Sequence, residues 1–186
     1  MEFLMAALIG VGLSAAAGFR VFTPLFIASL ASYLDWVNLS STFDWMGTLP
    51  ALIAFGVATL IEVGAYYLPV IDNFLSILAA PAAAIAGILL TASFITDSNP
   101  LLTWAVAIIA GGGAATLTNA ASGTARVAST ATTAGIANPA LSVVEDVTAV
   151  SVSLLSLFIP ILGIVLVIVV AFFIWRMRKK RRAVYS

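Results

Sequence analysis

The chain has 186 residues and a formal net charge of zero, with 62% hydrophobic and 9% charged residues. Its mean hydropathy of +1.16 leaves too little polar surface to coat a soluble globule of this size. The composition therefore excludes a soluble domain and predicts an all-α, polytopic membrane helical bundle. Cysteine and histidine are both absent, which excludes disulfides, thiolate or imidazole catalysis and the usual zinc sites. We expect no metal and no cofactor.

Apolar segments long enough to cross a bilayer predict about six spans. They are Phe3 to Ser32, Thr48 to Leu68, Phe74 to Ile95, Leu101 to Leu117, Pro139 to Phe158, and Ile159 to Trp175. Six of the eight Lys and Arg residues lie between Arg176 and Arg182, whereas the connection Tyr33 to Gly47 has none. Basic residues favour the cytoplasmic side, so we predict a multi-pass membrane protein with both termini cytoplasmic. We interpret the basic run as a topology anchor and expect no nucleic-acid partner.

Two segments do not resemble simple spans. Phe3 to Ser32 is about ten residues longer than one crossing of about 20 residues requires, and it contains Gly18, Arg20 and Pro24. We expect a crossing helix with a broken or re-entrant piece. The stretch Thr116 to Asn138 is rich in hydroxyls, which favours a second broken segment around Arg126 that lines a cavity. An extramembrane loop is the alternative.

An internal repeat connects these segments. Residues 14–23 align with residues 119–129 so that Gly18, Arg20 and Val21 match Gly123, Arg126 and Val127 with one insertion. Two proline landmarks also recur, Pro50 with Pro139 at an offset of 89 residues and Pro69 with Pro160 at an offset of 91. If each half has three crossings, the halves have opposite orientations and form a 3+3 inverted repeat. We place the repeats at 1–98 and 99–175, followed by a basic cytoplasmic tail at 176–186.

Charged residues inside the spans are the candidate functional residues. A charge at bilayer depth costs from about 2.5 to over 10 kcal/mol, so Arg20 and Arg126 require partners, water or a ligand. Acidic residues also occur inside the predicted spans, namely Glu62, Glu145 and Asp146. They are candidates for proton coupling or for structural ion pairs with the arginines. Polar residues near the arginines complete the candidate substrate site: Ser14, Thr23, Asn119, Ser122 and Thr124.

Three sequence stretches carry a family resemblance. Residues 13–25 (LSAAAGFRVFTPL), 68–73 (LPVIDN) and 138–146 (NPALSVVED) resemble the recurring motifs of a bacterial family of small integral membrane proteins, domain-of-unknown-function family 4126. The resemblance covers most of the chain and implies a multi-pass protein of the bacterial inner membrane and the location of a site, but no activity. An arginine near a proline in a re-entrant segment is also similar, by analogy, to the DedA-type lipid translocases.

Guanidinium groups beside hydroxyls suit phosphate, carboxylate and other oxyanions. We therefore expect a small transporter, translocase or channel for an anionic or polar substrate, with the site between the repeats near the membrane midplane. A non-transporting scaffold or assembly protein with structural ion pairs is the first alternative, and a DedA-like translocase of an anionic lipid headgroup is the second. Enzymatic activity is not expected, because no nucleophile and base combination occurs within the spans. Membrane lipids are expected partners, and the small-residue helix faces also allow a homodimer.

Overall fold

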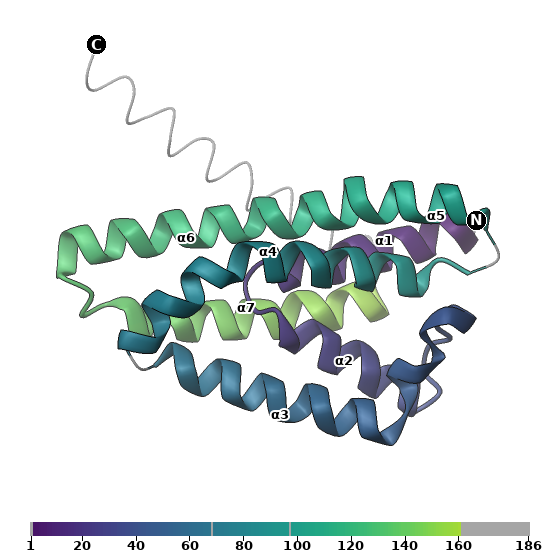
Figure 1. Ribbon diagram of the computed structural model, residues 1–186, viewed down its shortest axis with the longest axis horizontal. Helices are drawn as coiled ribbons and strands as arrows, with labels where there is room; N and C mark the ends of the chain where they lie inside the picture. Colours follow the sequence, from purple (N-terminus) through teal and green to yellow (C-terminus); the bar gives the residue numbers. More distant parts are fainter. Residues whose placement is uncertain (1, 68, 97, 161–186) are drawn as a thin grey trace, which may run out of the picture.

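The computed structural model describes residues 2–67, 69–96 and 98–160, and in the fourth helix the side chains from Leu78 onward. All regular structure in these ranges is helical. In chain order the elements are α1 (Glu2–Ala17), α2 (Phe22–Tyr33), η1 (Ser41–Gly47), α3 (Leu49–Tyr66), α4 (Pro69–Phe94), α5 (Pro100–Val106), η2 (Ala107–Gly112), α6 (Gly113–Thr133) and α7 (Asn138–Phe158). Figure 1 shows these helices lying side by side as one elongated bundle.

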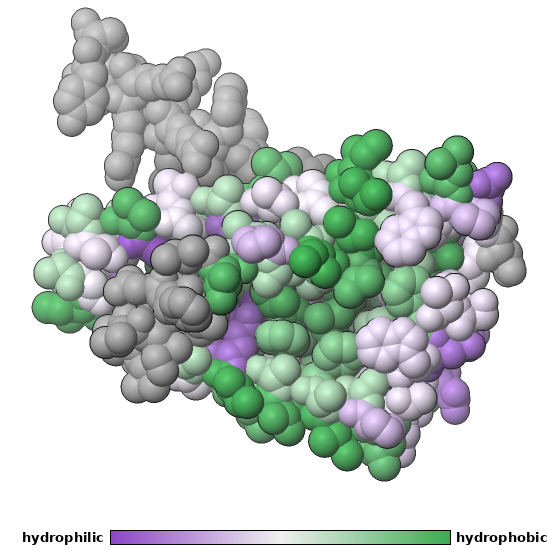
Figure 2. Space-filling model, in the orientation of Figure 1, coloured by the Kyte–Doolittle hydropathy of each residue, from purple (hydrophilic) through white to green (hydrophobic). Residues whose placement is uncertain are grey.

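Within the described part of the chain, three helical stretches are long and apolar enough to cross a membrane. They are Leu49–Tyr66, Pro100–Thr133 and Asn138–Phe158. Apolar residues cover much of the face shown in Figure 2, and hydrophilic residues gather near the end where α5 begins. Large apolar side chains remain exposed on the surface of the molecule, including Leu60 and Ile109, each 75% exposed. Lipid contact explains this exposure, because soluble monomers rarely expose large apolar patches.

Helix α1 lies antiparallel to α4. A Cβ atom added at Gly10 would lie 2.6 Å from the Cα atom of Thr91. One turn further along α1, the hydroxyl of Ser14 donates to the carbonyl oxygen of Gly87 at 2.6 Å. Because numbers rise along α1 as they fall along α4, the beginning of α1 lies beside the end of α4.

The end of α2 lies at this same end of the bundle. The hydroxyl of Ser29 donates to the carbonyl oxygen of Met46 in η1 at 2.6 Å. Just before η1, the backbone N–H of Ser40 donates to the carbonyl oxygen of Ser93 at 2.7 Å. Helices α1 and α2 therefore form a hairpin that enters and leaves at one end of the bundle, as Figure 1 shows.

This hairpin contains the break that was expected within Phe3 to Ser32. Its arms have 16 and 12 residues, fewer than the roughly 20 of a typical span, and the full crossing in this segment stays a prediction. The chain bends between α1 and α2, whereas Pro24 lies in the first turn of α2, where proline is tolerated. The beginning of α1 also lies at the same end as the segment 34–48, so the structure does not support placing them on opposite sides of a membrane.

A second correction concerns Arg126. We expected a broken segment around this residue or, alternatively, a loop, but α6 continues without a break from Gly113 to Thr133. Its hydroxyls are compatible with a helix because they donate to carbonyl oxygens one turn back, as Thr116 does to Gly112 and Thr132 to Ala128. The chain turns only at residues 134–137, where Ala134 and Gly135 have positive φ angles of 52° and 85°.

One pair of repeated prolines marks helix starts. Pro50 lies in the first turn of α3, and Pro139 lies in the first turn of α7. Helices α3 and α7 run in opposite directions in Figure 1, as an inverted repeat requires. The ring of Phe158, at the end of α7, lies 5.9 Å from that of Trp36, which precedes α3. The inverted repeat and its bounds stay predictions. The proposed span Ile159 to Trp175 and the tail 176–186 lie mostly or wholly outside the described residues.

Cysteine labelling tests the hairpin directly, because the chain has no cysteine of its own. The suitable sites are Leu4, Trp36 and Ile136, whose side chains are 60%, 59% and 85% exposed. We expect a membrane-impermeant maleimide to label Leu4→Cys and Trp36→Cys from the same side of oriented vesicles, and Ile136→Cys from the other side. Labelling of Leu4→Cys together with Ile136→Cys would show that α1 crosses the membrane.

Candidate functional site

Arg20 and Arg126 meet over one aromatic ring, although 106 positions separate them in the sequence. Arg20 lies at the tip of the α1–α2 hairpin, and Arg126 lies on α6. Their guanidinium carbons are 4.1 and 4.6 Å from the centroid of the Tyr66 ring, at the end of α3. The two arginines are 1% and 8% exposed. Cation–π attraction of about 2 kcal/mol or more is available to such desolvated pairs.

Glu145, on α7, bridges the two arginines. Its Oε2 atom accepts from Nη1 of Arg20 at 3.0 Å and also from Nη2 of Arg126. Its Oε1 atom accepts from Nε of Arg126 at 3.2 Å and from the hydroxyl of Ser122. The carboxylate is thus held by two guanidiniums and a hydroxyl in a position 4% exposed.

Asp146 provides the second carboxylate and is more exposed, at 19% of its side chain. Its Oδ1 atom accepts from Nε of Arg20, and its Oδ2 atom accepts from the hydroxyl of Tyr67 at 3.1 Å. Arg20, Arg126, Glu145 and Asp146 form what we call the charged cluster, in which the charges balance.

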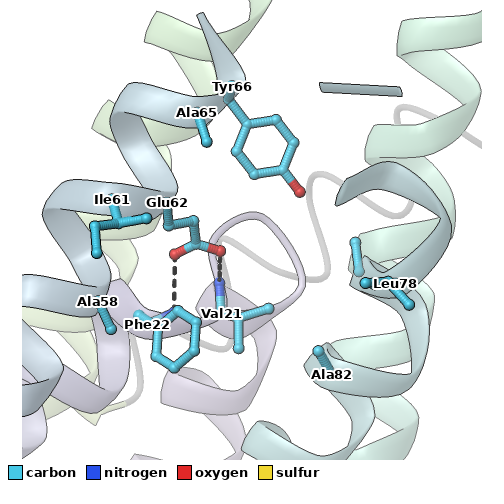
Figure 3. A pocket seen from close by; sticks show the side chains of 10 residues that line it. Val21, Phe22, Ala58, Ile61, Glu62, Ala65, Tyr66, Leu78 and Ala82 are labelled. Carbon is cyan, nitrogen blue, oxygen red and sulfur yellow. Dashed lines mark hydrogen bonds between the residues drawn. The ribbon is translucent and has the colours of Figure 1, made fainter. Parts of the chain in front are cut away.

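Glu62 has a different role from the ion pair that the sequence suggested. Its carboxylate oxygens accept from the backbone N–H groups of Val21 and Phe22 at 2.8 and 2.9 Å, as Figure 3 shows. These groups belong to the first turn of α2, where N–H groups have no partner within the helix. A carboxylate at a helix N-terminus is also favoured by the helix dipole. Glu62 therefore caps α2 from the neighbouring helix α3.

Two of the predicted polar residues lie at the cluster or beside it. Ser122 donates to Glu145, as described above. Asn119, one turn earlier on α6, donates from Nδ2 to the carbonyl oxygen of Gly18 at 3.2 Å. Asn119 thus attaches the tip of the hairpin to α6 and helps to position Arg20.

The other three have different surroundings. Ser14 contacts α4, where it donates to Gly87 and shares a hydrogen bond of 2.9 Å with the hydroxyl of Thr91. Thr124 donates to the carbonyl oxygen of Ala120 in its own helix. Thr23 is buried in the first turn of α2. These hydrogen bonds connect Ser14 to α4 and Thr124 to the preceding turn of α6.

Sequence reasoning missed Tyr66 and Ser142. The carbonyl oxygen of Ser142 accepts from Nη2 of Arg20 at 3.2 Å, and its hydroxyl bonds to Nη2 of Arg126 at 3.1 Å. Helical spacing offers a signal for both residues, because positions three and four apart share a helix face. Ser142 precedes Glu145 by three residues, and Tyr66 follows Glu62 by four.

An apolar groove of about 260 Å³ opens beside Glu62 and Tyr66. Figure 3 shows the side chains of α3 on one side of this groove and those of α4 on the other, with the Tyr66 hydroxyl pointing between them. The lining residues are Val21, Phe22, Ala58, Ile61, Glu62, Ala65, Tyr66, Leu78, Ala79 and Ala82. The groove is slightly smaller than the roughly 300–1,000 Å³ of ligand pockets in general.

Apolar helices of spanning length that enclose paired charges define a helical membrane protein. The chain belongs to the family described as domain of unknown function (DUF4126), whose model matches residues 7–180. The resemblance noted in the sequence is thereby confirmed over nearly the whole chain. No curated protein and no solved structure matches the chain.

Proposed function

We propose that the protein moves an anionic or polar substrate across the membrane and that the charged cluster is its binding site. The observation that carries this proposal is the bridging position of Glu145. Two buried guanidiniums, from segments far apart in the sequence, hold one carboxylate between them. The planar guanidinium groups of arginine bind carboxylate and phosphate with high geometric specificity. The internal carboxylate thus occupies the position that a substrate anion would take.

The charge of the cluster limits how a substrate anion could replace the Glu145 carboxylate. The cluster already holds two carboxylates for two guanidiniums, so an additional anion would leave an uncompensated buried charge, which is costly. Uptake of one proton by Glu145 or Asp146 removes that excess and frees donors for the substrate. We therefore propose that a monovalent anion enters the site together with one proton.

The hairpin offers a way to alternate access. Arg20 lies at the hairpin tip, and the tip is attached to α6 through Asn119 and to α3 through Glu62. A shift of the hairpin against α6 and α7 would break the bond to Asn119 and separate Arg20 from Glu145, while Arg126 stays on α6. Such a movement would open the cluster toward one end of the bundle.

Flux in reconstituted vesicles tests the proposal. Lactate and inorganic phosphate in mildly acidic buffer, both monovalent there, serve as soluble probes, and a fluorescent anionic phospholipid with one headgroup charge serves as the headgroup probe, with an imposed pH gradient. We expect at least one probe to move faster than in protein-free vesicles and to slow about tenfold or more in the double variant Arg126→Gln/Glu145→Gln. This variant removes one charge of each sign, so it avoids an unpaired buried charge. Undiminished flux in a folded double variant would refute the site.

A membrane scaffold is the second candidate. The carboxylate partners that both arginines already have favour it. Both guanidiniums already have carboxylate partners, so the cluster can serve folding alone. Hydration separates the two functions. Transport predicts that Ser122→Cys reacts with a small polar thiol reagent, whereas a scaffold predicts protection of this position and no flux of any probe.

A further inference from the structure

The groove beside Glu62 carries an unbalanced negative charge. The charged cluster contains two positive and two negative side chains, and Glu62 adds a third carboxylate close to it. Its compensation comes from the N-terminus of α2, which contributes roughly half a positive charge. Part of a negative charge therefore remains at the edge of an apolar groove.

We propose that this groove binds a lipophilic monovalent cation, with the apolar body of the cation between α3 and α4 and its charge beside Glu62. The inference goes beyond the proposed function, because it concerns a different surface and a ligand of the opposite charge. It rests on charge complementarity between Glu62 and the ligand.

The geometry of the groove suits such a ligand. Alanines at positions 58, 65, 79 and 82 leave the space between the two helices that larger side chains would fill. Each oxygen of Glu62 accepts one backbone N–H, and a carboxylate oxygen has two lone-pair sites, so each oxygen retains acceptor capacity. In Figure 3 the carboxylate and the Tyr66 hydroxyl are the polar groups at the groove, and apolar side chains form the rest of its wall.

Other occupants fit the groove less well. An anionic headgroup beside Glu62 would place like charges together in a poorly solvated position, which is unfavourable. A neutral acyl chain would fill the apolar space but would gain nothing from the carboxylate. A cation gains both the apolar contact and the charge attraction.

Tetraphenylphosphonium and tetraphenylborate provide a matched pair of probes, because they share one shape and carry opposite charges. Binding is measured by equilibrium dialysis against the full chain in a nonionic detergent. We expect saturable binding of tetraphenylphosphonium, about tenfold weaker binding in Glu62→Gln, and loss of binding in Ala82→Phe, which fills the groove. Ala80→Phe is the matched control, because Ala80 lies on α4 and is exposed outside the groove lining. It should bind like the unmodified protein.

Two further comparisons separate a loss of the groove from a failure to fold and from the proposed transport site. Ala82→Phe leaves the cap made by Glu62 intact, so it reports on the groove even if Glu62→Gln does not fold. The double variant Arg126→Gln/Glu145→Gln should retain tetraphenylphosphonium binding, which separates this inference from the proposed function. Equal binding of tetraphenylborate, or unchanged binding in folded Glu62→Gln, would overturn the proposal. So would a copurifying phospholipid, detected by native mass spectrometry, that Ala82→Phe loses.

Discussion

Replacing Glu145 with glutamine will destabilise the protein by about 3–5 kcal/mol, the cost of removing one partner from a buried ion pair. The loss is large because this one carboxylate accepts hydrogen bonds from both Arg20 and Arg126, and both arginines are buried. The four tryptophans of the chain allow the change to be measured by intrinsic fluorescence during unfolding in detergent or bicelles.

Asp146→Asn is the matched comparison for this prediction. Asp146 contacts Arg20 but is 19% exposed, against 4% for Glu145, so water compensates for part of the lost charge. We expect a smaller loss of stability than for Glu145→Gln. Adding Arg126→Gln to Glu145→Gln should restore part of the loss, because residues within one network couple by about 0.5–3 kcal/mol. Equal losses in the two single variants, or no restoration, would show that Glu145 does not bridge the arginines.

The partners of the arginines follow from the sequence to a large extent. The cost of a charge within a membrane requires partners, and the acidic residues inside the spans are few, so Glu145 and Asp146 were evident candidates. The sequence did not predict that one of these adjacent residues would bridge both arginines while its neighbour contacts Arg20 and Tyr67. That division depends on where α7 lies relative to the hairpin tip, which is a property of tertiary packing.

The α1–α2 hairpin was predicted only in part. The excess length of the first segment and the interruption at Gly18 and Arg20 indicated a broken helix. The place of each arm in the bundle is set by contacts with α4 and η1, such as those of Ser14 and Ser29, and by the cap that Glu62 provides from α3. Local sequence contains no direct sign of these long-range contacts, so it did not predict that both arms meet the same end of the bundle.

Around Arg126 the sequence predicted a broken segment, but the structure has a continuous helix. The density of hydroxyls suggested unwound backbone, yet threonine can donate to the carbonyl oxygen one turn back within a helix. Thr116, Thr124 and Thr132 all do so. A hydroxyl that donates within its own helix does not require a polar cavity. The number of hydroxyl residues in α6 therefore did not indicate unwound backbone.

Close helix contact leads to the second large prediction, that Gly87→Ala will destabilise the bundle. A Cβ atom at this position would lie 2.7 Å from the carbonyl oxygen of Gly111 and 2.7 Å from the Cβ atom of Ala115. Because one of these neighbours is backbone, α4 and η2 must separate, and overpacking of this kind costs about 1–3 kcal/mol. The shift would also strain the hydrogen bond from Ser14 to Gly87, which attaches the hairpin to α4.

Gly123→Ala is the matched control, since a Cβ atom there would meet no atom within 4 Å. Alanine is favoured over glycine inside a helix by roughly 0.5–1 kcal/mol, so this variant should be slightly more stable than the unmodified protein. The same substitution thus has opposite signs at two helical positions, and unfolding midpoints of the two variants, measured in one detergent, report the difference. If both alanines stabilise the protein, α4 and η2 are not in backbone contact at Gly87, and the attachment of the hairpin to α4 would have to be reconsidered.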